Sequence, residues 1–140
     1  MPVTTTPAYL QTVQDFQVQI LPADTTANKT LATAGTNGTK ILAINVSSTD
    51  TTARDIQLKK TVSGTDYILS TFNIPITAGF INSTPSVNLF NHGQMQGLPR
   101  DANGNPFIQL ETGTTLTVAS LTTVTAAKII SVVALAAADY

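Results

Sequence analysis

Short stretches of alternating apolar and polar residues recur along the chain, and this is the pattern of half-buried β-strands. The first covers Phe16, Val18 and Ile20, which alternate with glutamines. Residues 40–46 are apolar on both faces of an extended chain, so we expect a central strand there. Further strands are expected over residues 30–33, 55–60, 67–76, 107–110, 115–119 and 128–136.

Glycine, asparagine and proline mark the boundaries between these strands. Asn37-Gly38 and Thr112-Gly113-Thr114 each predict a tight hairpin turn, because Asn and Gly tolerate positive φ. In residues 85–91 a proline stands at the first helical position, which predicts one or two turns of helix. Residues 1–14 contain two prolines and no hydrophobic period, so we expect an arm that is flexible alone and orders on a partner.

Together these elements predict an all-β fold. Seven to eight strands at spacings of about 8 to 12 residues are typical of an antiparallel β-sandwich or jelly roll, here with one short helix near residues 85–91. The length of 140 residues favours a single domain, residues 15–140, after the arm of residues 1–14. The number of strands does not fix their connectivity, so jelly-roll and immunoglobulin-like strand orders both stay open.

The scarcity of charge adds a second expectation. The chain has 7 Lys and Arg and 8 Asp and Glu, and only 11% of its residues are charged, against about a quarter in an average protein. This balance favours neither nucleic acid nor an anionic membrane as a partner. A surface of hydroxyls and amides has weak protection against association, so we expect a protein that packs against neighbours. A secreted or viral β-protein that merely uses Thr on its polar face is the alternative.

The sequence also shows no segment typical of a signal peptide or of a transmembrane helix. No stretch approaches the roughly 18 consecutive apolar residues of a transmembrane helix. The first residues have neither the basic start nor the apolar stretch of a signal peptide, so we expect the protein to be made and used without export.

We expect no catalytic, cofactor or metal site. The absence of Cys excludes disulfides and thiolate chemistry, and the chain holds a single His, His92. No nucleophile elbow or His-Glu pair accompanies His92, so a loop or interface histidine is favoured over a hydrolase. Residues 101–105 resemble a calcium loop, but their glycine is at the fourth position and the twelfth position is Thr112, which favours an ordinary turn. The basic residues Arg54, Lys59 and Lys60 are expected to form a solubilising face.

The second half of the chain carries a set of segments with a further pattern. They are Ile74-Pro75-Ile76-Thr77-Ala78-Gly79, Pro85-Ser86-Val87-Asn88-Leu89-Phe90-Asn91, Gly97 to Pro106, Leu110 to Leu116, and Lys128 to Tyr140 with its final Ala138-Asp139-Tyr140. Together they resemble small structural proteins of tailed-bacteriophage virions, namely β-sandwich head decoration or cement proteins and related minor virion components. The resemblance covers about residues 64–140 and is one of pattern, with no single diagnostic motif.

This resemblance implies a non-enzymatic subunit that is bound in many copies on an icosahedral capsid, often as a trimer, and reinforces it. The implied partners are the major capsid protein and copies of the chain itself, on the capsid surface of a virion made in the host cytoplasm. No cofactor, nucleic acid, membrane or small-molecule substrate is expected.

We expect the two chain termini to make the contacts between subunits, because an ordered terminus and an added strand both use free backbone groups. The candidate interface residues are Val3, Thr4, Thr5, Thr6, Tyr9, Leu10 and Tyr140. The alternative function is a receptor- or glycan-binding module of a phage tail or of a bacterial surface protein.

Overall fold

The computed structural model describes residues 9–140 and confirms an all-β fold. Its strands are β1 (Thr12–Ile20), β2 (Lys29–Thr33), β3 (Thr39–Ser48), β4 (Arg54–Val62), β5 (Thr65–Ile74), β6 (Val87–Asn88), β7 (Ile108–Leu110), β8 (Thr114–Ser120) and β9 (Ile130–Asp139). Two short 3-10 turns, η1 (Pro22–Asp24) and η2 (Leu89–Asn91), interrupt them. Nothing helical in residues 9–140 is long and apolar enough to cross a membrane.

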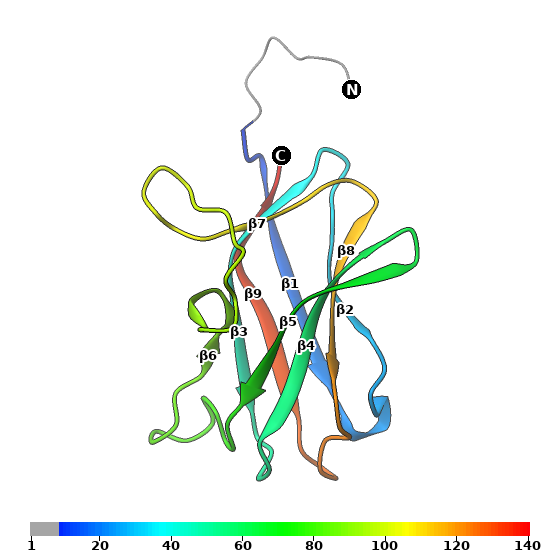
Figure 1. The fold of residues 1–140 in the computed structure, drawn as a ribbon, viewed down its shortest axis with the longest axis vertical. Coiled ribbons are helices and arrows are strands. Elements are labelled where there is room, and N and C mark those ends of the chain that lie inside the picture. Colours follow the sequence, from blue (N-terminus) through cyan, green and yellow to red (C-terminus); the bar gives the residue numbers. More distant parts are fainter. Residues whose placement is uncertain (1–8) are drawn as a thin grey trace.

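The strands form two antiparallel sheets that face one another (Figure 1). One sheet has the order β1-β9-β3-β6, with β7 also paired to β3, and the other has the order β2-β8-β4-β5. Strand β3 lies inside its sheet, between β9 on one side and β6 and β7 on the other. Its apolar residues on both faces therefore predicted its central position correctly.

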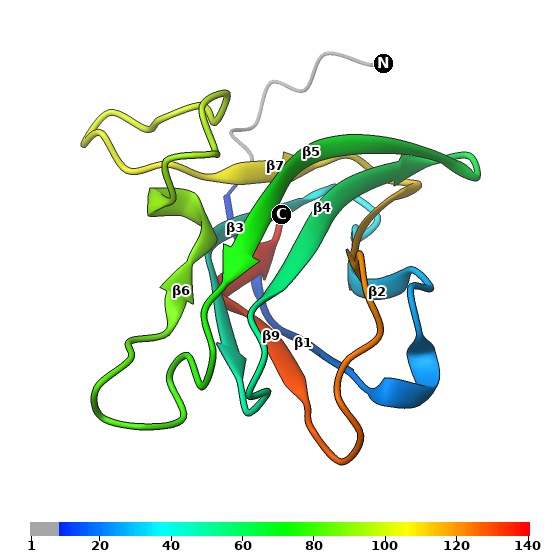
Figure 2. The ribbon, with the colours of Figure 1, turned by 60° about the horizontal axis from the view of Figure 1, so that its bottom comes forward.

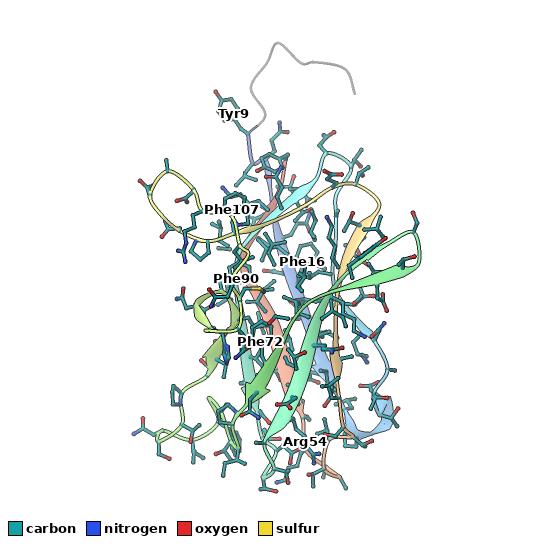
Figure 3. The ribbon with its side chains drawn as sticks, in the orientation of Figure 1. Tyr9, Phe16, Arg54, Phe72, Phe90 and Phe107 are labelled. Carbon is teal, nitrogen blue, oxygen red and sulfur yellow. The ribbon has the colours of Figure 1, made fainter. Side chains whose placement is uncertain are left out.

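One apolar core fills the space between the sheets. The alternation along each strand sends every second side chain inward, and burial of each large one contributes about 1.5–3 kcal/mol. Phe72 on β5 belongs to this core, and the partly buried Phe16 on β1, in the opposite sheet, packs against it (Figure 3). The core also includes Ile20, Ile44, Val46, Ile56, Leu58, Leu116, Val118, Ile130 and Val132.

The helix expected over residues 85–91 is matched only loosely, by a single 3-10 turn at Leu89–Asn91. Val87 and Asn88 instead pair with Val46 and Asn45 of β3, so the segment begins as a strand. Only a three-residue 3-10 turn follows, and the Asn88 side chain accepts a hydrogen bond from the Phe90 N–H at 3.0 Å to cap it. The backbone pairing with β3 competes with helix formation after Pro85 and prevails.

Neither expected hairpin is present. Asn37-Gly38 leads from β2 in one sheet to β3 in the other, and residues 112–114 lead from β7 to β8 across the same gap. Gly38 and Gly113 do have positive φ, at 94° and 81°, as the turns require. The glycines set the local backbone, but the strands on either side take partners that are distant in the sequence.

Strand β1 begins within the expected arm of residues 1–14. The Gln11 N–H donates to the Asp139 carbonyl at 2.8 Å, and Thr12 and Gln14 pair with Asp139 and Ala137 of β9. Backbone pairing of this kind needs no hydrophobic alternation, which is why the pattern placed the start of the strand at Asp15. Residues 3–6, the remaining arm positions among the candidate contacts, lie outside the described residues.

Candidate interaction surfaces

The described part of the chain, residues 9–140, begins and ends at the same end of the fold (Figure 1). Tyr9 and Leu10 are exposed there, directly before the Gln11 that bonds to Asp139, and Figure 3 shows Tyr9 extending away from the sheets. The Tyr140 N–H donates to the Gly38 carbonyl at 3.1 Å. The structure thus brings three of the predicted contact residues, Tyr9, Leu10 and Tyr140, to the same end, while Val3, Thr4, Thr5 and Thr6 lie outside the described part of the chain.

A carboxylate holds the terminal end together. Asp139 accepts a hydrogen bond from Gln14 Nε2 at 2.7 Å through Oδ2, and its Oδ1 accepts one from Thr39 Oγ1. Gly35 packs so close that a Cβ at this position would lie 2.6 Å from Asp139 Oδ2. The end of β9 is therefore fixed to β1 and to the start of β3.

The opposite end of the fold carries an uncharged apolar loop, residues 75–86, between β5 and β6 (Figures 1 and 2). Ile76, Phe80 and Ile81 in this 75–86 loop are 50%, 63% and 45% exposed. Leu121, in the loop between β8 and β9, is exposed as well. Large apolar side chains gathered on a loop end in this way are typical of a surface that contacts another molecule.

The backbone of the 75–86 loop is hydrogen-bonded to the body of the protein. The Ser48 N–H donates to the Ala78 carbonyl at 2.8 Å, and the Thr77 N–H donates to the Asp50 carbonyl at 3.0 Å. A further bond of 2.8 Å within the loop joins the Gly79 N–H to the Thr84 carbonyl. Because Ala78 is fully buried, the loop is pinned at its centre while its large apolar side chains face outward.

Asp50 is the hub of this end of the protein. Its fully buried carboxylate accepts hydrogen bonds from Arg54 Nε at 2.8 Å, Thr125 Oγ1 at 2.7 Å, and the N–H groups of Thr52 at 2.9 Å and Thr125 at 3.1 Å. Arg54 also donates to Thr125 Oγ1 at 2.8 Å and Thr122 Oγ1 at 3.0 Å. With its carbonyl bonded to Thr77, Asp50 ties the β3–β4 loop to both the 75–86 loop and the β8–β9 loop.

This environment keeps Asp50 ionised. Burial alone would raise the pKa of the carboxyl, but the hydrogen bonds from Thr125 and Arg54 outweigh burial and hold the pKa well below its ordinary value of 3.8. Sequence reasoning missed this hub, because its partner Thr125 is 75 residues away in the chain. The only signal is the spacing of four residues between Asp50 and Arg54, which by itself does not reveal Thr125.

The basic residues are separated by the structure and form no common face. Arg54 points into the Asp50 network, whereas Lys59 Nζ donates to Asn28 Oδ1 at 2.8 Å. Lys60 lines a cavity between the sheets. The prediction of a shared solubilising face was therefore wrong, because Lys59 and Lys60 point to opposite sides of their sheet and Arg54 is bound in the Asp50 network.

His92 and Asp101 take part in local structure. The His92 ring meets the edge of Phe72 at a centroid distance of 5.1 Å, and its Nδ1 accepts the Gln94 N–H at 3.1 Å. Asp101 Oδ1 accepts the N–H groups of Asn103 and Asn105, both at 2.9 Å, which is the turn that the sequence favoured. Within residues 9–140, no three His, Asp or Glu side chains gather closely enough to hold a metal ion.

No protein-family model and no curated protein matches this chain. The function therefore has to be argued from its own surfaces.

Proposed function

We propose that this protein is a capsid decoration, or cement, protein that binds the assembled head of a tailed bacteriophage in many copies and stabilises it. One observation carries the proposal: the uncharged 75–86 loop exposes Ile76, Phe80 and Ile81 on a backbone that is hydrogen-bonded in place. The sequence pattern of residues 64–140, which resembles such proteins, supports the same role.

The 75–86 loop suits repeated docking on a shell. Burial of a large apolar side chain contributes about 1.5–3 kcal/mol, so three of them supply a useful contact without any charge pairing. Because the loop backbone is already ordered by Ser48 and Asp50, binding loses little conformational entropy. A contact of moderate strength is sufficient, since many linked copies on one shell act at a high effective concentration.

The chain termini are the proposed contacts between neighbouring copies in a trimer. Tyr9, Leu10 and Tyr140 lie at the end of the fold opposite to the 75–86 loop, and the uncharged residues Val3, Thr4, Thr5 and Thr6 precede them in the sequence. One end of each subunit would then bind the shell while the other end joins its neighbours. We further propose that the two sheets form an antiparallel β-sandwich with an N-terminal arm, and that the protein is not an enzyme.

Co-sedimentation with phage shells that lack the protein tests this function. The purified chain should be a trimer by light scattering, should saturate at a fixed ratio to the shell subunits, and should raise the temperature at which the shells disrupt. If the protein is a monomer and stays in the supernatant when the shells sediment, the proposal is overturned.

A further inference from the structure

Strand β5 forms an open edge of its sheet. It pairs with β4 on one side, and no other described strand lies beyond it (Figure 2). Its ten residues contain a single charged side chain, Asp66, and no proline. The other edges are protected: β1 carries a bulge and Asp15, β2 has five residues, and β6 and β7 have two and three. Long open edges without such protection readily pair with another chain.

The open edge also presents apolar side chains. Tyr67, Ile68 and Leu69 follow one another along β5 and are 56%, 61% and 40% exposed. Farther along the strand, Ser70 Oγ donates to the Gln94 carbonyl at 2.9 Å, so the loop after η2 reaches β5 at that point. The open part of the edge is therefore residues 65–69.

A bulge turns Leu69 toward a cavity. Leu58 pairs with Ser70 and Lys59 pairs with Ile68, which leaves Leu69 as an extra residue of β5. Bulges of this kind re-aim a side chain. Leu69 lines a cavity of about 270 Å³ between the sheets, whose wall includes Met95, Leu98, Ile108, Leu110 and Leu116. The cavity is thus mostly apolar and adjoins the open edge.

The register of the sheet places one cation on the cavity wall. Leu116 pairs with Lys60, and Lys60 pairs with Tyr67, so these three side chains form a row on the same face of the sheet. Leu116 and Lys60 both line the cavity. Among residues 9–140 the Lys60 ammonium has neither an ion-pair partner nor a hydrogen-bond partner.

We propose that residues 65–69 and the adjoining cavity bind an extended segment of another polypeptide, which adds a strand to β5 and carries an aliphatic side chain and, two residues away on the same face, a carboxylate. In an added strand, the residue opposite Tyr67 lies on the cavity side of the sheet, where an aliphatic side chain meets Leu69 and the apolar wall. Backbone pairing provides the affinity, and the cavity and Lys60 provide the selectivity.

Charge distinguishes this occupant from a second copy of the chain. A copy that paired through its own β5 would bring only one carboxylate, that of Asp66. Asp66 already accepts hydrogen bonds from Thr61 Oγ1 at 2.7 Å and Asn28 Nδ2 at 2.6 Å. Lys60 would remain without a partner, so an acidic peptide segment fits the site better. The inference concerns a different face from the 75–86 loop and does not depend on the proposed function.

Selection from a displayed library of random heptapeptides on the purified full-length protein tests the inference. Enriched peptides should share an aliphatic residue with Asp or Glu two residues away, and should lack proline at the centre. On the Lys60→Glu variant, the enriched peptides should exchange the acidic residue for Lys or Arg. Enrichment of no common pattern, or of the same acidic peptides on Lys60→Glu, would overturn the inference.

Affinity measurements with one enriched peptide, made synthetically and labelled with fluorescein, complete the test. Leu69→Asp should weaken binding by about tenfold or more, while Val13→Asp, at an exposed apolar position of β1, should leave it unchanged. Thermal unfolding of both variants checks that they are folded. Equal losses of peptide affinity in the two variants would contradict the inference. So would a protein that binds no peptide but forms a dimer that Leu69→Asp abolishes.

Discussion

The guanidinium of Arg54 donates from Nε to the buried carboxylate of Asp50 at 2.8 Å, only four residues away along the chain. The same carboxylate accepts a hydrogen bond from the hydroxyl of Thr125, which is 75 residues away in the sequence. Asp50 therefore joins a local ion pair to a long-range contact, and the end of the protein that carries the 75–86 loop depends on it.

Removal of the Asp50 carboxylate should strongly destabilise the fold. In Asp50→Ala the Arg54 guanidinium, which is largely buried, loses its ionic partner, and breaking such a pair costs about 3–5 kcal/mol. Urea denaturation measures the loss in free energy of unfolding. Asp55→Ala is the control, because Asp55 is exposed, and it should cost about 0.5 kcal/mol. Equal effects of the two substitutions would show that the Asp50 hub contributes nothing special.

Acid should weaken the protein through Asp50. In the unfolded chain its pKa is near the ordinary value of 3.8, whereas in the folded protein the pKa is lower. Below pH of about 4 the unfolded state therefore binds more protons, so the contribution of Asp50 is complete above that pH and is lost as the pH falls toward the folded pKa. Urea denaturation between pH 7 and pH 2 should show this decline.

Asp50→Asn should flatten the pH dependence, because the amide takes up no proton. Some slope should remain, since the pKa values of Asp24, Asp66 and Asp101 are also lowered by their hydrogen bonds. An unchanged slope in Asp50→Asn would place the acid sensitivity at Asp24, Asp66 and Asp101 instead.

The shape of the 75–86 loop should depend on Gly79. Its φ is 69°, and a Cβ there would lie 2.9 Å from the Ser86 Cβ and 3.2 Å from the Ser47 Cβ. Gly79→Ala therefore adds a steric clash to an unfavourable φ and should cost about 2 kcal/mol in thermal or urea unfolding.

Gly113→Ala separates the two causes, because Gly113 has a φ of 81° but no neighbour within 4 Å. It should cost only about 1 kcal/mol, the penalty of the positive φ alone. If Gly79→Ala is no worse than Gly113→Ala, the contacts of Gly79 with the two serines do not constrain the loop.

The apolar tip of the 75–86 loop should matter for binding and not for folding. Phe80 is exposed, so Phe80→Asp should change the free energy of unfolding by about 0.5 kcal/mol or less. It should lower the affinity for phage shells by about tenfold or more, because a charge replaces an apolar contact. Leu135→Asp, at an exposed position on β9, is the matched control. Loss of shell binding in Leu135→Asp alone would move the contact surface to the outer face of that sheet.

The alternation of apolar residues predicted much of the fold, namely the positions of its strands, because burial of one strand face is a local property. Phe16, Val18 and Ile20 marked β1, and the two apolar faces of residues 40–46 marked the central β3. The sequence pattern could not predict which strands pair with one another. Asn37-Gly38 forms a turn in either case, and whether it joins two paired strands or two sheets depends on residues far along the chain.

The candidate surfaces were predictable only where they follow from composition. The low charge is visible in the sequence, and Tyr9, Leu10 and Tyr140 lie at one end of the described fold. The Asp50 hub and the cavity beside Leu69 are built from separate segments, so their residues become neighbours only after folding. No local sequence pattern predicts a cluster that is assembled from distant segments in this way.

The proposed virion role is tested most directly by a cryo-electron microscopy reconstruction of tailed-phage particles assembled in the presence of this protein. The account predicts density for the two-sheet fold in many symmetric copies on the outer surface of the head, with the 75–86 loop against the shell. Copies confined to the tail, or particles that lack the protein altogether, would contradict it.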